Sequence, residues 1–291
     1  VVGGGIGGCT AALSLHQAGV DVALFEKAPA VEALGLGINL TPQAVKILSD
    51  LGLGDALKST AVQTSTMLLA GNRGLNVWSE PRGLAAGNPY PQYSIHRGRL
   101  AQLLFDAVQQ RLGGGAVFLG HEIVSVDSGA GDNDTEVTAT FRASTGETIT
   151  IKGDALVGCD GLASKVRKQF YSSRAQFTGW VCWRGCSEMD EAMDGATMQI
   201  MGRIQDSETG AILGGKKDAA FVCYPMDPVL QGTGRMLLNW VAERRWDIPP
   251  SYALAMLCQP GLAVAKAIAS WDHGHHGFAV ALQFTTLIVA R

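Results

Sequence analysis

A glycine-rich turn near the start of the chain carries the first spacing that could do chemistry. Residues 3–8 read Gly-Gly-Gly-Ile-Gly-Gly, so Gly3, Gly5 and Gly8 satisfy the pattern GxGxxG. In such a turn the first glycine makes a tight bend, the second lets the backbone approach a pyrophosphate, and the third lets the next helix pack on a strand. The pattern predicts a dinucleotide site, and the alternative is an ordinary tight turn.

The residues after this turn follow the order that a dinucleotide site requires. Apolar residues from Ala11 to Leu15 have helical spacing, and Gly19 can end that helix. Residues 20–25 predict a buried strand that ends at Glu26. A carboxylate there can accept hydrogen bonds from both ribose hydroxyls and repels a 2′-phosphate, which favours FAD or NAD over NADP. The alternative for Glu26 is a solvated strand end.

Two later segments bear on the choice between FAD and NAD. Residues 155–167 read as an apolar strand that runs into Asp160-Gly161 and then into a short basic helix. Residues 93–100 open another helix around Arg97. A guanidinium suits phosphate oxygens, and an Asp-Gly turn lets backbone lie close to a charged linker. Alternatively, Arg97 is an ordinary surface cation and Asp160 a helix N-cap.

Taken together, these segments resemble the FAD-dependent monooxygenases of the para-hydroxybenzoate and salicylate hydroxylase type. The resemblance rests on motifs that occur in the family's order: GxGxxG, then Glu26-Lys27, Gly35 to Ile38 with Pro42, Arg97 to Leu100, and Gly158 to Arg167. It continues through residues 177–185 and reaches about Glu243.

The resemblance implies FAD as the cofactor and assigns roles at the matched positions. Arg97 would contact the FAD pyrophosphate or ribityl region, Asp160 and Gly161 would lie near the pyrophosphate, and Arg167 would lie close to the docked nicotinamide. The expected cofactor-binding residues are Gly3, Gly5, Gly8, Glu26, Lys27, Arg97, Asp160 and Gly161.

The family reaction is the hydroxylation of a small aromatic ring, phenolic or an aromatic acid. NADH or NADPH is the co-substrate that reduces FAD, and dioxygen then forms a flavin C4a-hydroperoxide that the electron-rich ring attacks. The protein must hold the ring, promote phenolate formation and exclude water. No catalytic base follows from the sequence, although Tyr224 is a candidate.

The resemblance also implies the fold class, which is α/β. We expect a Rossmann-like FAD-binding domain of the glutathione-reductase type, made of residues 1–61 and 94–172. A β-sheet substrate domain would contain residues 62–93 and 173–246, and residues 247–291 would form an atypical C-terminal segment.

Strand patterns locate the substrate domain and a hairpin outside it. Residues 136–152 alternate polar and apolar side chains around Ser144-Thr145-Gly146, which predicts an exposed hairpin. Residues 62–79 predict a second hairpin that turns at Asn72-Arg73-Gly74, and residues 177–241 are rich in further strands. Aromatic and methionine side chains of the substrate sheet could line a pocket or could simply form sheet core: Trp180, Trp183, Phe221, Tyr224 and Met226.

Composition excludes several other classes of protein. Hydrophobic residues make up 47% and charged residues 17%, with a net charge of −3 and no basic stripe, so we expect a globular protein that does not bind nucleic acid. The 6 cysteines form no CxxC pair and predict free thiols. With no signal peptide and no membrane-spanning apolar run in the sequence, we expect a cytoplasmic location. The adjacent histidines in residues 272–276 lack helical i, i+4 spacing, so no metal site is expected.

The last part of the chain departs from the family. Family members carry a Gly-Asp-Ala-Ala-His-Pro segment after the substrate domain, and residues 247–291 contain no match to it. We therefore expect this chain alone to bind FAD weakly and to hydroxylate little. The leading alternative is a truncated or non-catalytic FAD-binding remnant. A nicotinamide-dependent dehydrogenase would leave Asp160-Gly161 unexplained, and a flavin halogenase or geranylgeranyl-reductase-like enzyme shares only the first motif.

Overall fold

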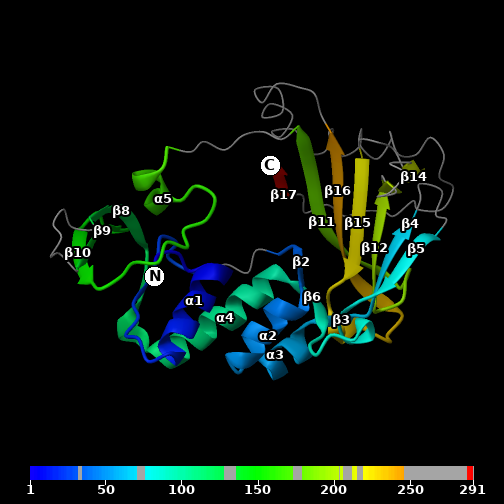
Figure 1. The fold of residues 1–291 in the computed structure, drawn as a ribbon, viewed down its shortest axis with the longest axis horizontal. Coiled ribbons are helices and arrows are strands. Elements are labelled where there is room, and N and C mark those ends of the chain that lie inside the picture. Colours follow the sequence, from blue (N-terminus) through cyan, green and yellow to red (C-terminus); the bar gives the residue numbers. More distant parts are fainter. Residues whose placement is uncertain are drawn as a thin grey trace. The chain divides into compact units, whose positions relative to one another are not determined.

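The computed structural model describes residues 1–31, 35–70, 76–127, 136–172, 179–202, 204–205, 212–214, 219–245 and 287–290. The predicted turn at residues 72–74, the histidine-rich residues 272–276 and most of residues 247–291 lie outside the described residues. The chain divides into two compact units, shown with their elements in Figure 1. The first unit comprises Val1–Leu34, Leu48–Ala56 and Arg97–Arg174, and the second comprises Gly35–Ile47, Leu57–His96 and Ala175–Arg291.

A short parallel sheet and two helices form the centre of the first unit. Strand β1 (Leu24–Glu26) pairs in parallel with β7 (Val117–Leu119), and Val2 bridges in parallel to Phe25 and to Gly158. Helix α1 (Ile6–Gln17) packs beside α4 (Arg97–Leu112), as Figure 1 shows. The strand predicted over residues 20–25 is shorter than expected, because only Leu24 to Glu26 has a ladder partner in β7; Val20 is 47% exposed.

An antiparallel sheet adjoins this centre and confirms the predicted hairpin. Its strands are β8 (His121–Asp127), β9 (Val137–Ala143) and β10 (Thr148–Gly153), and Gly146 takes a φ of +93° in the turn between the last two. The hairpin is not exposed on both faces. Phe141 is buried and stacks on Phe25 with the two ring centroids 4.0 Å apart, which joins this sheet to the parallel centre. Helix α5 (Lys165–Phe170) follows.

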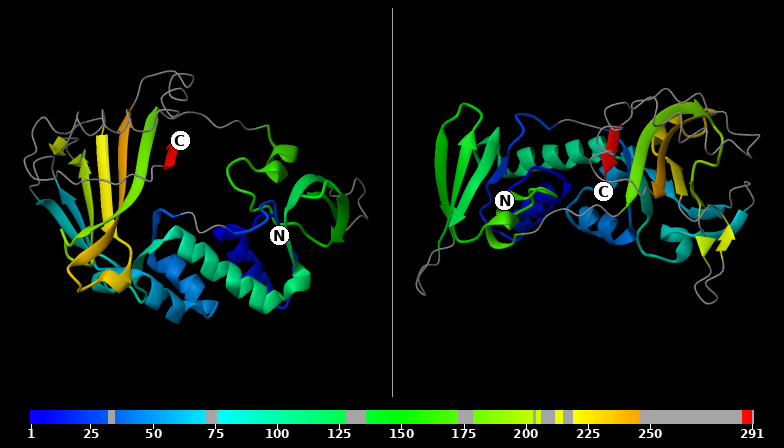
Figure 2. Two further views of the ribbon diagram at one scale, coloured as in Figure 1. Left: turned by 180° about the vertical axis from the view of Figure 1, so that it is seen from behind. Right: turned by 90° about the horizontal axis from the view of Figure 1, so that it is seen from above.

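The second unit is built around a seven-stranded sheet with the order β17-β11-β16-β15-β12-β4-β5. The strand bounds are β4 (Thr66–Ala70), β5 (Asn76–Pro81), β11 (Trp180–Asp190), β12 (Thr197–Gly202), β15 (Ala219–Pro225), β16 (Arg235–Arg245) and β17 (Leu287–Ala290). Neighbouring strands are antiparallel except β12 and β4, which are parallel. Figure 2 shows β4 and β5 beside β12, so one sheet joins separated stretches of sequence, as predicted.

A smaller sheet in the same unit has the order β2-β6-β3. Its strands are β2 (Gly37–Leu40), β3 (Val62–Thr64) and β6 (Gln92–His96). The strand predicted over residues 62–70 therefore divides at Ser65, because Val62–Thr64 pairs with β6 whereas β4 pairs with β5 and β12. Residues 35–47 belong to the compact second unit, because β2 pairs with β6 rather than with β1.

The remaining described elements are short. They are α2 (Pro42–Asp50), α3 (Gly54–Thr60), β13 (Ile204–Gln205), β14 (Ile212–Gly214) and the 3-10 helices η1 (Gly83–Ala86), η2 (Gly114–Ala116) and η3 (Pro228–Leu230). Within the described ranges, no helix is both long enough and apolar enough to cross a membrane. The described cysteines Cys9, Cys159, Cys182, Cys186 and Cys223 are free thiols, and Cys258 lies outside the described residues.

Candidate functional site

The glycine turn of the first unit has no room for side chains at its first and last glycines. Gly3 has a φ of +104°, and a Cβ on it would overlap the carbonyl oxygen of Cys159. A Cβ on Gly8 would overlap the carbonyl oxygen of Gly3. Both obstacles are backbone atoms, which cannot turn aside as a flexible side chain can. The tight bend and the close packing of α1 on the turn therefore depend on these two glycines.

The middle glycine of the motif has a different environment. A Cβ on Gly5 would meet nothing within 4 Å, so the chain itself does not require glycine there. Gly5 is the N-cap of α1, and it provides no side chain to accept hydrogen bonds from the first N–H groups of that helix. Such an open helix start attracts anions through its free N–H groups and its dipole. The space beside Gly5 thus fits a phosphate group that comes close to the backbone.

Glu26 lies at the glycine turn, and its predicted role as a ribose ligand stays a prediction. Its carboxylate accepts hydrogen bonds from the backbone N–H of Gly4 at 2.5 Å and of Ala28 at 2.8 Å. A carboxylate has about four acceptor positions, so both oxygens keep capacity for hydroxyl donors. The neighbouring Lys27 is exposed. The arrangement fits the adenosine end of a dinucleotide.

Asp160 reaches the same turn from a distant part of the chain. Its backbone nitrogen would lie 3.0 Å from a Cβ on Gly3, so the fold brings the two motifs together. Its carboxylate, however, accepts hydrogen bonds from the hydroxyl of Ser164 and from the N–H groups of Lys165 and Val166 at the start of α5. Burial raises the pKa of Asp160, but these hydrogen bonds outweigh it and lower the pKa below its usual value.

The N-cap of α5 is Ser164 rather than Asp160, but the Asp160 side chain does bind the first N–H groups of that helix, close to the helix-cap alternative. Gly161 beside it has a φ of +77° and open space where a Cβ would lie. The backbone of this turn, rather than the Asp160 carboxylate, is the part that is free to face a charged linker. A cofactor role for these two residues stays a prediction.

The two predicted arginines differ in how they are used. Arg97, the first residue of α4, is exposed and has no hydrogen bond or ion pair with any described residue. It is therefore available to a phosphate. Arg167 donates from its guanidinium to the carbonyl oxygen of Leu162 at 2.5 Å, and its backbone N–H donates to Ser164. That side chain stabilises the turn before α5, and its predicted place near a nicotinamide stays untested.

The Gly35 to Ile38 motif lies in the second unit, against the large sheet. The N–H of Gly37 donates to Oδ1 of Asn239 on β16 at 2.6 Å, and Asn239 is fully buried. A Cβ on Gly37 would lie 2.6 Å from atoms of Asn239 and Tyr224. A Cβ on Gly35 would overlap the imidazole of His96, which gives that histidine a structural place.

Asn239 is absent from the residues predicted by sequence. It lies 202 positions from Gly37, and no local pattern connects the two. The contact follows only from the register of β16 and from the position of β2.

The predicted aromatic pocket does not form as one group. Side chains alternate between the faces of a strand, and the registers place Trp183 and Phe221 on the face that carries the buried core of the sheet. Tyr224 lies on the opposite face with Asn239, since Gly37 packs against both. Burial raises the pKa of Tyr224 to about 12, although the charge of Arg184 opposes this. Tyr224 is thus a neutral phenol near pH 7, which argues against it as the catalytic base.

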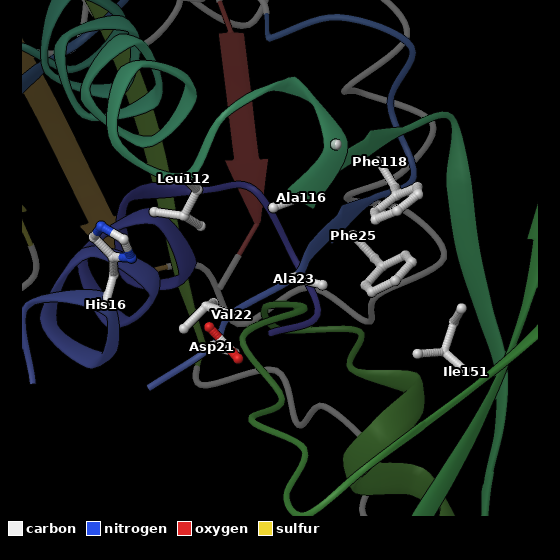
Figure 3. Close-up of a pocket in the computed structure, with 10 residues that line it drawn as sticks. His16, Asp21, Val22, Ala23, Phe25, Leu112, Ala116, Phe118 and Ile151 are labelled. Atoms are coloured by element: carbon white, nitrogen blue, oxygen red, sulfur yellow. The ribbon is translucent and has the colours of Figure 1, made fainter. Parts of the chain in front are cut away.

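One hollow of about 450 Å³ lies in the first unit, away from the glycine turn. Figure 3 shows its lining residues, which include His16 near the end of α1 and Phe25 of β1. The full lining is His16, Asp21, Val22, Ala23, Phe25, Leu112, Gly115, Ala116, Phe118 and Ile151. The glycine turn is at the opposite end of α1, so this hollow is not the predicted dinucleotide site. Among the described residues, no cluster of histidine, cysteine or carboxylate groups is suited to a metal ion.

Comparison with known proteins places the chain in a family. Residues 1–229 match the model of the FAD binding domain family. The chain is 37% identical over 244 residues to phenazine 1,6-dicarboxylic acid hydroxylase PhzS of Lysobacter antibioticus, a match that covers 83% of this chain and 56% of that protein. The chain is also 35% identical over 189 residues to 3-hydroxybenzoate 6-hydroxylase of Polaromonas naphthalenivorans, covering 63% and 44% respectively.

Solved structures agree on the fold. The crystal structure of Klebsiella pneumoniae HpxO with FAD and uric acid matches with a TM-score of 0.64 at 22% identity, covering 86% of this chain and 56% of that one. The chain thus belongs to the FAD-binding monooxygenase family, as the sequence motifs predict, and it has the mixed α/β fold of that family. It spans about half the length of the curated relatives it matches, 56% and 44% in the two cases above.

Proposed function

We propose that this chain is the FAD-binding and ring-binding part of a monooxygenase that hydroxylates a small aromatic compound, with NADH or NADPH as the electron donor and dioxygen as the oxidant. The observation that supports this most directly is the open face of Gly5 at the start of α1, next to Glu26. Relatives named as hydroxylases of aromatic acids support the aromatic substrate.

The first unit would hold the nucleotide end of FAD. Backbone N–H groups beside Gly5 and at the start of α1 would bind the pyrophosphate, and Glu26 would accept hydrogen bonds from the ribose hydroxyls. The guanidinium of Arg97, which pairs with no described residue, would add positive charge near the phosphates. Bound FAD supplies the redox chemistry, while the protein orients the ring of the substrate and excludes water from it.

A flavin titration tests this assignment. The chain is purified, its FAD content is measured by absorbance, and FAD is titrated by flavin fluorescence. We expect Gly5→Val to lower FAD affinity by at least a hundredfold, because its side chain fills the space meant for phosphate. Gly7→Val is a matched control at another glycine whose Cβ meets nothing within 4 Å. Equal FAD affinity in Gly5→Val and the parent chain would contradict the proposed site.

A second candidate is an FAD-binding protein without hydroxylase activity. The family model that residues 1–229 match describes FAD binding and names no reaction, which supports this candidate. Oxidation of NADH and NADPH is therefore followed with and without aromatic compounds, together with product analysis. Bound FAD with no aromatic-stimulated oxidation would favour the second candidate, whereas hydroxylated product would exclude it.

A further inference from the structure

The large sheet of the second unit has two chemically different faces. One face carries the buried apolar cluster of Val181, Trp183, Cys223, Met236, Leu238 and Trp240. Arg184 on β11 pairs with Val241 on β16, and Asn239 on β16 pairs with Tyr224 on β15. Because side chains alternate along each strand, Arg184, Tyr224 and Asn239 all point to the other face. We name the face around these three residues the polar face.

Arg184 brings a positive charge to the polar face, and no carboxylate among the described residues is paired with it. Its side chain is partly buried, its Nε is fully buried, and that Nε has no hydrogen-bond partner among the described residues. Three carboxylates share the face. Glu188 and Asp190 pair with Arg235 at 3.2 and 2.6 Å, and Glu243 accepts a weak hydrogen bond from Cys182 at 3.9 Å. A guanidinium that is partly desolvated and unpaired is costly, and an anion would remove that cost.

The other two residues of the polar face add donors without adding negative charge. Oδ1 of Asn239 is used by Gly37, whereas its buried Nδ2 has no partner among the described residues. Tyr224 is a protonated phenol, and it lies close enough to Arg184 to feel its charge. The next residues on the face are Val222 and Val241, which face each other across β15 and β16. An apolar surface thus lies beside a group of donors.

We propose that the polar face binds an aromatic carboxylate, with Arg184 as the specificity-determining residue that recognises the carboxylate of the substrate. The planar guanidinium can donate two parallel hydrogen bonds to a carboxylate, and the valine side chains provide an apolar contact for the ring. This inference rests on the proposed function, because it names the substrate class of that monooxygenase. Tyr224 and Asn239 act as positioning residues that fix the Gly35–Gly37 segment at the edge of this surface.

Ligand binding to the 291-residue chain tests the inference without any turnover. The probes are 3-hydroxybenzoate and 3-hydroxy-2-naphthoate, each compared with its primary amide by isothermal titration calorimetry, with and without FAD. We expect each carboxylate to bind at least about tenfold more tightly than its amide, since hydrogen bonds between charged groups are the stronger ones. Equal binding of acid and amide, or no binding of either, would overturn the inference without any variant.

Variants of Arg184 locate the effect. Arg184→Gln should weaken carboxylate binding by about tenfold to a hundredfold and leave amide binding within about twofold of the parent chain. Arg184→Lys keeps the charge but loses the planar fork, so it should restore only part of the preference. Arg235→Gln removes a cation from the same sheet at an exposed site and should change neither ligand.

The outcomes separate this inference from the proposed function. One outcome is that the Arg184→Gln chain keeps the circular dichroism of the parent and yet binds the acid and the amide more weakly by equal factors. That result would assign Arg184 a structural role and overturn the inference. A similar loss of acid preference in Arg235→Gln would do the same, because it would reflect net charge alone. Failure to bind FAD would contradict the proposed function, while a carboxylate preference that persists and depends on Arg184 would still support the polar face.

Discussion

The glycine turn of the first unit presents backbone groups to a ligand, whereas the polar face of the second unit presents side chains. At the turn, the absence of side chains at Gly3 and Gly8 permits the tight bend, and their absence at Gly5 leaves open space beside the first N–H groups of α1. On the polar face, the side chains of Arg184 and Asn239 matter, and the backbone is used by the strand ladders.

This contrast indicates a division of labour between the two units. A backbone surface recognises a pyrophosphate, which every molecule of the cofactor carries. A side-chain surface can change by substitution while its sheet stays the same, and it is therefore the better place for substrate choice. Substitutions in the two regions should accordingly fail in different ways.

The largest effect is expected at Gly8. Gly8→Ala places a Cβ on the carbonyl oxygen of Gly3, so the turn or α1 must move. We expect the free energy of unfolding to fall by about 2–4 kcal/mol, as for other severe backbone clashes, and FAD binding to be lost. Urea unfolding and flavin fluorescence measure the two effects.

Gly7→Ala is the matched control for this change. Gly7 is inside α1 and its Cβ would meet nothing within 4 Å, so alanine should stabilise the chain by about 0.5–1 kcal/mol. If Gly8→Ala unfolds at the same urea concentration as Gly7→Ala, the packing of α1 on the turn is not as tight as described.

The next largest effect is expected at Glu26, whose carboxylate accepts a hydrogen bond from Gly4 in the glycine turn. Glu26→Ala should weaken FAD binding by about 1–3 kcal/mol, the loss expected for charge-assisted hydrogen bonds. Glu26→Gln keeps an acceptor oxygen and the shape of the side chain, so its loss should be smaller. FAD titration of both folded variants measures the difference. Unchanged affinity in Glu26→Ala would remove this residue from the site.

How far the sequence predicts these regions depends on the distance over which residues act. The glycine motif and Glu26 lie within 26 positions and act through local backbone, so their arrangement could be predicted from spacing. The strand before Glu26 is predicted too long, because Val20, Val22 and Ala23 suggest a strand although the ladder with β7 begins only at Leu24. The alternation and spacing of apolar residues indicate the periodicity of a strand, but they do not show whether a neighbouring strand pairs with it.

The second unit shows the limit more clearly. Its strands could be located, and Tyr224 could be chosen as an aromatic residue of the sheet. The face on which it lies depends on the register between β15 and β16, which no local pattern gives. The same register separates Tyr224 from Trp183, so these side chains cannot line one pocket on one face of the sheet, and the sheet-core alternative holds for Trp183. Asn239 could not be found at all, because its contact with Gly37 joins residues that lie 202 positions apart in the sequence.

A moderate effect on stability is expected at Asn239. Asn239→Ala leaves the N–H of Gly37 buried without an acceptor, which should lower the free energy of unfolding by about 1–3 kcal/mol. Asn88→Ala removes a partly buried asparagine that bonds to the carbonyl oxygen of Gly83 at 3.1 Å, and it should cost about 0.5–1.5 kcal/mol. Thermal unfolding compares the two. A smaller loss at Asn239 than at Asn88 would show that β2 is not held by this amide.

The smallest effect is expected at Asp160, and it depends on pH. Hydrogen bonds from Ser164, Lys165 and Val166 lower the folded-state pKa of this carboxyl, despite its partial burial. The unfolded chain has an aspartate pKa of about 3.9. The ionised carboxylate therefore contributes stability that is fully present above that value and is lost as the pH falls through the lower, folded-state pKa.

Asp160→Asn should consequently be less stable than the parent chain at pH 7, and the difference should shrink as the pH falls below about 4. Urea unfolding at a series of pH values measures this convergence, with the exposed Asp154→Asn as a control expected to follow the parent chain. FAD affinity sharpens the comparison between backbone and side-chain recognition. If the backbone around Gly161 faces the pyrophosphate, Asp160→Asn should lower stability more than it lowers FAD affinity. A large loss of FAD affinity with unchanged stability would instead assign the carboxylate directly to the cofactor.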